Sequence, residues 1–218
     1  DKNNHMNSIN NFIDHTNLKQ DAIESDITTL CKEAIQHGFF SVCVNPFHVP
    51  LAAINLKEHK PKVGTVIGFP LGADSGEMKY AETRFMIHQG AEEIDMVLNI
   101  GALKDRSFEV IRKEINKVVE ASDGNSVKVI IEACLLNNEE IKIACKIAKD
   151  AGATFVKTST GFSSGGATIE DVKLMRKTVG ADMGVKASGG IKSLEHIELL
   201  IDAGANRIGT SNAVEILK

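Results

Sequence analysis

The hydrophobic and polar positions along the chain follow two different periods that alternate. Short runs rich in valine and isoleucine are separated by longer stretches in which apolar residues recur every three or four positions. The short runs are typical of buried strands and the longer stretches of amphipathic helices, so the alternation predicts parallel strand–helix units. The predicted strands cover residues 12–16, 41–45, 63–69, 93–99, 127–133, 155–160, 184–188 and 207–211.

The number of these units favours a closed barrel. Eight strands separated by helical stretches predict a (β/α)8 TIM barrel of the α/β class. The clearest predicted helices cover residues 107–122, 138–152, 168–180 and 193–204, and the last one, at 212–218, is short. Glycine often ends a helix, and such ends are expected at Gly38, Gly90, Gly152 and Gly204.

One domain is expected over residues 1–218. A chain of 218 residues that is 43% hydrophobic can bury one sizeable core. No proline- or serine-rich linker and no low-complexity stretch divides it. We interpret residues 1–11 as an N-terminal extension; because the chain begins at Asp1 rather than at methionine, either residues are missing before it or part of it was added in cloning.

Charge and cysteine usage limit the classes of partner and compartment. The net charge is −4, and no basic run is interleaved with aromatic residues, so neither nucleic acid nor a membrane surface is an expected partner. No signal peptide or apolar segment of about 20 residues is found. The cysteines lack CxxC spacing, which favours reduced thiols and a cytoplasmic protein; they are Cys31, Cys43, Cys134 and Cys145.

Several charged side chains are expected to meet inside the barrel. Alternate residues of a strand lie on opposite faces, and Ile94, Met96 and Leu98 form an apolar face suited to packing under helices. Asp95 therefore faces the lumen. The same rule places further polar side chains on the lumen side of their strands, namely Lys128, Lys157, Lys186, Asp14 and Cys43.

Two lumen lysines occur in nearly the same sequence motif, "FVKTSTG" around Lys157 and "GVKASGG" around Lys186. Burial and a like charge nearby both favour a neutral lysine, which can attack a carbonyl carbon. Two unit charges about 4 Å apart repel by roughly 4 kcal/mol at an effective dielectric near 20. That repulsion would lower a lysine pKa from about 10.4 to about 7.5. The pair thus predicts an amine nucleophile.

The residues that end the last three strands indicate a phosphate site. Barrels commonly bind phosphate with backbone N–H groups at this place, and glycine permits close approach. The residues concerned are Gly161, Gly189, Gly190 and Ser211. Residues 161–166, "GFSSGG", lack the GxxxxGK[ST] pattern and are interpreted as a mobile loop over the site.

Other chemistries find no support in the pattern. The seven histidines form no HxH or HExxH motif, so no metal is expected. No GxGxxG follows a strand, and no GxSxG is present, which argues against dinucleotide and serine-hydrolase chemistry. No cofactor is therefore expected.

Over residues 12–213 the chain closely resembles the deoxyribose-phosphate aldolase family. The resemblance is carried by "IDHT", "SVCVNP", "TVIGFPLGA", "EIDMVLNIGAL", "VKVIIEA", "FVKTSTGF", "VKASGGI" and "RIGTS". It implies a class I aldolase that reversibly cleaves 2-deoxy-D-ribose 5-phosphate into D-glyceraldehyde 3-phosphate and acetaldehyde, in deoxyribose phosphate catabolism. The expected partners are thus a phosphorylated sugar and small aldehydes, and the family suggests a homodimer.

The resemblance also implies residue roles. Lys157 stands at the family's Schiff-base position, Lys186 at that of the second lysine, and Asp95 at that of the acidic proton relay. Positions that line the sugar site are matched by Asp14, Cys43, Lys128 and Thr160, and the phosphate-binding turns by Gly161, Gly189, Gly190 and Ser211.

One departure and two alternatives remain open at this point. Some family members end in a tail with a tyrosine that reaches the site, whereas the single tyrosine here is Tyr80. Another Schiff-base barrel, such as a transaldolase or an aldolase for a different sugar phosphate, would use the same lysine. A phosphosugar-binding barrel without activity would have no need of the paired lysines.

Overall fold

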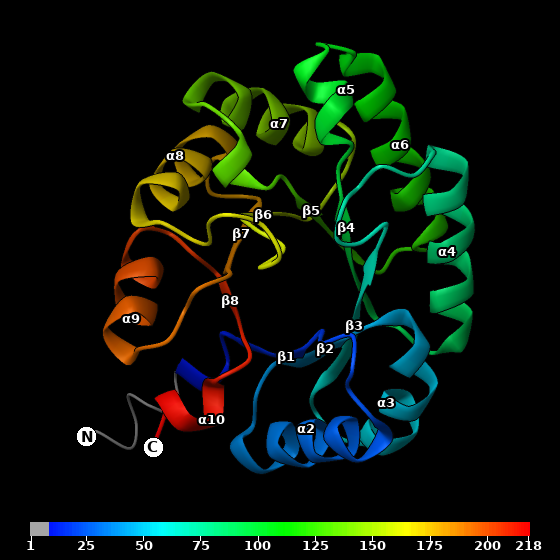
Figure 1. The fold of residues 1–218 in the computed structure, drawn as a ribbon, viewed down its shortest axis with the longest axis vertical. Coiled ribbons are helices and arrows are strands. Elements are labelled where there is room, and N and C mark those ends of the chain that lie inside the picture. The colour runs from blue at the N-terminus through cyan, green and yellow to red at the C-terminus, as the bar shows by residue number, and fades with distance from the viewer. Residues whose placement is uncertain (1–8) are drawn as a thin grey trace.

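The computed structural model describes residues 9–218, and over these residues the strands form one closed parallel barrel. Each strand pairs with the next along the chain and β8 pairs with β1, as Figure 1 shows. The predicted (β/α)8 fold is confirmed. Most of the predicted N-terminal extension lies outside the described residues. The strands are β1 Ile13–Asn17, β2 Ser41–Val44, β3 Lys62–Ile67, β4 Glu93–Val97, β5 Ser126–Ile130, β6 Phe155–Lys157, β7 Gly184–Ser188 and β8 Arg207–Thr210.

Helices form the outer ring around this barrel (Figure 1). The helices predicted between residues 107 and 204 are confirmed, and α10 is short, as expected. Gly38 and Gly90 end α2 and α4 in the left-handed conformation. The helices are α2 Glu24–His37, α3 Val49–Leu56, α4 Gly76–Gln89, α5 Ile100–Lys104, α6 Phe108–Ala121, α7 Asn138–Asp150, α8 Ile169–Val179, α9 Leu194–Asp202 and α10 Ala213–Ile216, with 3-10 turns at Pro46–His48 and Ala133–Leu135.

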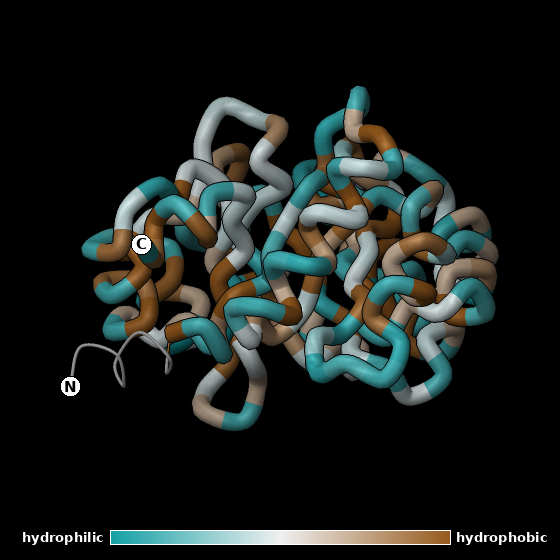
Figure 2. Tube along the Cα trace, turned by 90° about the horizontal axis from the view of Figure 1, so that it is seen from below, coloured by the Kyte–Doolittle hydropathy of each residue, from teal (hydrophilic) through white to brown (hydrophobic). Residues whose placement is uncertain are grey.

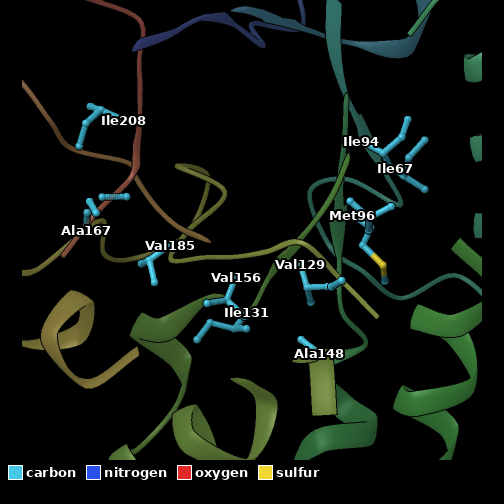
Figure 3. Packing of buried hydrophobic residues seen from close by; sticks show 14 of the residues in the cluster. Ile67, Ile94, Met96, Val129, Ile131, Ala148, Val156, Ala167, Val185 and Ile208 are labelled. Atoms are coloured by element: carbon cyan, nitrogen blue, oxygen red, sulfur yellow. The ribbon is translucent and has the colours of Figure 1, made fainter. Parts of the chain in front are cut away.

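The hydrophobic core lies between the strands and the helices. Outward-facing strand residues such as Met96, Val129, Val156 and Val185 are fully buried there, and Figure 3 shows several of them. Hydrophobic and hydrophilic stretches alternate along the chain, as the colours of Figure 2 show. This division leaves the inward-facing strand residues free to be polar.

Strand register sets the heights of the lumen residues. Lys157 is level with Lys186 on the next strand, and Asp95 is level with Lys128. Strand β6 is shorter than predicted because side chains take over the hydrogen bonds of the ladder beyond Lys157. The hydroxyl of Thr158, for example, donates to the carbonyl of Ser188 on β7 (3.0 Å).

Candidate active site

A cavity of about 500 Å³ opens at the carboxyl ends of the strands. This is the end at which TIM barrels carry their sites, because the βα loops meet there. Of the three lumen lysines, Lys157 alone lines the cavity, while Lys128 and Lys186 lie buried beneath it. The cavity also receives residues from the loops after β1, β6, β7 and β8.

Asp95 is the centre of the charged lumen. Its Oδ1 accepts a hydrogen bond from Lys128 (2.8 Å), and its Oδ2 accepts one from Lys157 (2.9 Å) and one from Lys186 (2.8 Å). The carboxylate is 1% exposed. Burial by itself would raise the pKa of Asp95, but the three ammonium groups outweigh burial and hold this pKa well below its usual range. Asp95 is therefore ionised.

The pKa values of Lys157 and Lys186 are shifted in opposite directions. Burial is the largest cause that lowers the pKa of Lys157; Asp95 opposes it, and the positive charge of Lys186 adds to it. Burial also disfavours the charged form of Lys186, but Asp14 and Asp95 outweigh it and raise the pKa of Lys186. The direction expected for Lys157 from the paired motifs is present, although burial contributes more than the repulsion between the amines.

Asp14 and Cys43 lie beside this centre, on the lumen side of β1 and β2. An ion pair of 2.6 Å joins Asp14 Oδ2 to Lys186 Nζ, and the hydroxyl of Ser41 donates to Asp14 Oδ1 (2.7 Å). Burial raises the pKa of the Cys43 thiol, which is 2% exposed. Cys43 packs with Leu18 and Val66, so it presents an apolar wall rather than a thiolate.

Thr160 is held by a glutamate that the sequence did not mark as a site residue. The carboxylate of Glu132 accepts hydrogen bonds from the backbone N–H of Thr160 (3.1 Å) and from its hydroxyl (2.6 Å). The same hydroxyl oxygen accepts the N–H of Phe162 (3.0 Å). Glu132 has a φ of 51°, a left-handed conformation that is strained for a side chain of this size. Thr160 thus organises the loop after β6.

Two further lumen residues were missed from the sequence, Glu93 and Arg207. Glu93 accepts a hydrogen bond from Lys128 (2.9 Å), and Arg207 donates to Glu93 and to Asp14. Both are at least 96% buried, since their exposed fractions are 3% and 4%. Each lies at the start of its strand on the same face as a residue further along it, Glu93 with Asp95 and Arg207 with Gly209, which lines the cavity. Extending the alternation rule by two residues would have found both.

The four predicted phosphate residues all line the cavity, at its end formed by the loops after β6, β7 and β8. Gly161, Gly189 and Gly190 have φ values of 84°, 86° and 71°, which glycine adopts without strain. Within residues 9–218, the backbone N–H groups of these glycines and of Ser211 have no protein acceptor. Lys19 and Lys192 line the same cavity. Free N–H groups and nearby ammonium groups are suited to an anion.

The loop at residues 161–166 lies at the rim of the cavity. The ring of Phe162 packs edge to face on Phe69 from the β3–α4 loop, with 5.4 Å between their centroids. Gly166 approaches the backbone of Gly189 so closely that an added Cβ would lie 2.2 Å from its carbonyl oxygen. The loop is thereby connected to two walls of the site. Its predicted mobility stays a prediction.

No group of three or more histidine, cysteine, aspartate or glutamate side chains suited to a metal ion occurs in residues 9–218. Among the same residues, no helix is both long and apolar enough to cross a membrane.

The chain matches known proteins over nearly its whole length. Residues 9–211 match the family model described as DeoC/LacD family aldolase. A protein named deoxyribose-phosphate aldolase from Thermococcus gammatolerans is 56% identical over 211 residues, which are 95% of this chain and 94% of that protein. One of the same name from Clostridium perfringens is 58% identical over 206 residues, 94% of this chain and 92% of that protein.

A solved structure agrees with these matches. It is the structure of the deoxyribose phosphate aldolase from Aeropyrum pernix, which its authors describe as a unique tetramer. The two sequences are 33% identical, and the two structures superimpose with a TM-score of 0.91. The match covers 97% of this chain and 90% of the Aeropyrum pernix chain.

Proposed function

The chain belongs to the DeoC/LacD family of aldolases, and on that premise we propose that it reversibly cleaves 2-deoxy-D-ribose 5-phosphate into D-glyceraldehyde 3-phosphate and acetaldehyde. The observation that carries this proposal is the environment of Lys157. It is the lumen lysine that lines the cavity, and its pKa is lowered, while Lys128 and Lys186, which do not line it, have raised pKa values. The lowered pKa favours the neutral amine at the place where a substrate carbonyl can enter.

Lys157 supplies the electron sink of the proposed reaction. Its neutral amine adds to the C1 carbonyl of the open-chain sugar, and loss of water from the adduct gives an iminium ion. A base then takes the proton of the C3 hydroxyl, and the C2–C3 bond breaks. The electron pair of that bond forms the C1–C2 double bond of an enamine while the π pair of the iminium moves to nitrogen, and D-glyceraldehyde 3-phosphate leaves. Protonation at C2 and hydrolysis release acetaldehyde and restore the amine.

Asp95 is the proposed general acid and base for these proton transfers. Its Oδ2 lies 2.9 Å from Lys157 Nζ, within the reach that proton transfer requires. Because the pKa of Asp95 is far below neutrality, the carboxylate acts by accepting a proton briefly and passing it on, through a water molecule, to the reacting oxygen or carbon. Lys186 supplies the nearby charge that keeps Asp95 ionised and adds to the lowered pKa of Lys157.

The phosphate group is proposed to bind at the turns after β6, β7 and β8. Its oxygens would accept hydrogen bonds from the N–H groups of Gly161, Gly189, Gly190 and Ser211, with the ammonium group of Lys192 nearby. Binding energy at this far end of the sugar fixes C1 against the amine, which lowers the entropic part of the barrier. Of the four residues predicted to line the sugar site, Thr160 alone lines the cavity. The other three, Asp14, Cys43 and Lys128, act through the charges and the packing that they contribute beneath it.

The experiment that tests the proposal is reductive trapping. Protein treated with borohydride in the presence of acetaldehyde should gain the mass of one ethyl group on the peptide that contains Lys157. With deoxyribose 5-phosphate the protein should release acetaldehyde, and transaldolase donors should not support turnover. A label on another lysine, or a trapped adduct without any release of acetaldehyde, would contradict the proposal.

The assembly and the place of action extend the proposal. A homodimer in the cytoplasm, active in the breakdown of deoxyribose phosphate, is the form we propose. The exposed apolar side chains of Phe47 (85% exposed) and Ile54 (74%) on the outer surface support an interface between copies. Light scattering of the purified protein measures the mass of the assembly, and a monomer or tetramer would contradict the dimer.

A further inference from the structure

The charged side chains around Asp95, beside and beneath Lys157, form a closed ring in which the sign of the charge alternates. Starting at Asp95, each member contacts the next, and the last contacts Asp95 again. Six of the contacts complete the circle: Asp95–Lys186 (2.8 Å), Lys186–Asp14 (2.6 Å), Asp14–Arg207 (2.8 Å), Arg207–Glu93 (2.6 Å), Glu93–Lys128 (2.9 Å) and Lys128–Asp95 (2.8 Å). Its members come from five strands, β1, β4, β5, β7 and β8.

The ring is electrically neutral when all its members are ionised. It holds the carboxylates of Asp14, Glu93 and Asp95 and the cations of Lys128, Lys186 and Arg207. Lys157 lies outside the ring and pairs with one member of it, Asp95. If Lys157 is neutral, the buried cluster carries no net charge. If Lys157 is protonated, the cluster carries a net charge of one positive unit.

The ring is kept from water on its lower side by two aromatic rings. The guanidinium carbon of Arg207 lies 3.6 Å from the centroid of Phe40 and 5.8 Å from that of Phe155. Lys128 Nζ lies 5.7 Å from the centroid of Phe155. Gly184 leaves the space for this last ring, because an added Cβ there would lie 2.2 Å from Phe155. Charges act more strongly on one another in such a dry interior than in water.

We propose that Arg207 and Glu93 are positioning residues for the reaction, which set the protonation state of Lys157 by keeping the ring beneath it closed and neutral. Neither lines the cavity. They act through Asp14 and Lys186 on one side of the ring and through Lys128 and Asp95 on the other. This inference rests on the proposed function of Lys157 and adds two residues that no substrate contact would identify.

The physical reason is the cost of an unpaired charge in a buried site. A net positive charge in a closed interior disfavours the protonated form of the one cation that is free to lose its proton. The pKa directions agree with this distribution. Burial opposes the charge of every ring member, yet the neighbouring opposite charges hold the pKa of each carboxyl below its usual value and that of each cation above it. Lys157 alone is shifted toward its neutral form.

The groups that face Lys157 also include a thiol. They are Asp95 on β4, Lys186 on β7 and Cys43 on β2, and burial keeps the thiol in its neutral form by raising the pKa of Cys43. Because the thiol carries no charge, the balance that Lys157 experiences is set by the ring. Changing one ring charge should therefore shift the pKa of Lys157 in a direction that the sign of the removed charge determines.

Two single variants should shift the pH profile in opposite directions. Arg207→Met leaves the ring with one excess negative charge, so the pKa of Lys157 should rise. Glu93→Gln leaves one excess positive charge, so this pKa should fall. The measurement is the rate at which acetaldehyde and cyanoborohydride label Lys157, followed by mass spectrometry from about pH 5 to pH 10. Each inflection should shift by about one unit, as for a unit charge about 12 Å away at an effective dielectric near 20.

The double variant separates charge from structure. Arg207→Met combined with Glu93→Gln removes one charge of each sign, so the inflection should return close to that of the unmodified protein. Arg207→Lys keeps the charge and should also leave the inflection in place. Lys104→Met and Glu109→Gln remove exposed charges of the same signs on α5 and α6 and serve as matched controls. Thermal unfolding of every variant reports its folding.

The outcomes distinguish this inference from the proposed function. If Lys157 of the unmodified protein is not labelled, the proposed function fails. If Lys157 is labelled but Glu93→Gln and Arg207→Met both keep the original inflection, or both shift it in the same direction, the role of the ring is wrong. Should Arg207→Met fail to fold, Glu93→Gln, which preserves the shape of the side chain, decides the question together with Arg207→Lys.

Discussion

Lys157 and Lys186 lie opposite each other on adjacent strands, and both donate a hydrogen bond to the same oxygen, Oδ2 of Asp95. The shared carboxylate brings the two amines together and neutralises only part of their charge. Lys186 has a second carboxylate, Asp14, whereas Lys157 has none. This difference makes Lys186 the permanent cation of the pair and Lys157 the amine that can lose its proton.

Replacing Lys157 with alanine should abolish turnover. Without the amine no Schiff base forms, and loss of a covalent nucleophile typically lowers the rate by roughly a thousandfold or more. Acetaldehyde release and reductive labelling measure the effect. Lys146→Ala, at an exposed position of α7, is the control. Appreciable remaining turnover by Lys157→Ala would show that another group is the nucleophile.

Replacing Lys186 with methionine should shift the acid limb of the pH–rate profile to higher pH. Lys186 lowers the pKa of Lys157 by its positive charge, so its removal raises that pKa and leaves less neutral amine near pH 7. Activity should fall at neutral pH and recover in part as the pH rises. The profile of kcat/KM measured with deoxyribose 5-phosphate reports this pKa. An unchanged acid limb would exclude a charge effect of Lys186 on Lys157.

Gly209→Ala should reduce activity while the fold is preserved. A Cβ at this position would lie 3.0 Å from Cε of Lys186 and 3.1 Å from Cβ of Ser188, so the lysine that contacts Asp95 must shift by a few tenths of an ångström. Since a misplacement of about 1 Å can cost about a hundredfold in rate, this smaller shift should cost less than that. Gly101→Ala on α5 is the control, because its Cβ would meet its nearest neighbour at an ordinary 3.5 Å. Equal activity of the two variants would contradict the expected displacement.

Glu132→Ala should weaken substrate binding more than it slows the chemical step. The variant loses the two hydrogen bonds that hold Thr160, and with them the fixed course of the loop that leads to Gly161. Loss of about 1 to 2 kcal/mol of binding free energy, because the loop is no longer held in place, would raise KM roughly tenfold. The affinity for inorganic phosphate, measured as competitive inhibition, should fall in parallel.

Glu139→Ala, at an exposed position of α7, is the control for the loss of a carboxylate. A large drop in kcat for Glu132→Ala with an unchanged KM would instead place Glu132 in the chemistry.

The positions of the eight strands could be predicted because strand and helix periods are local properties of the chain. Alternation within single strands also placed Asp95, Lys128, Lys157 and Lys186 on the lumen side. The ends of the strands depend on tertiary contacts. Strand β6 ends at Lys157 rather than at Thr160, because the carboxylate of Glu132 takes the N–H that a longer strand would have paired.

The sequence by itself determined the barrel, the inward direction of its lysines and the glycine turns at the ends of the last strands. Only the tertiary structure decided which charges meet across the lumen. Arg207 contacts Asp14 and Glu93 across 193 and 114 residues of chain. Such contacts depend on the register and closure of the whole sheet, which no local period encodes. Burial, the largest cause that lowers the pKa of Lys157, likewise exists only once the barrel has closed around it.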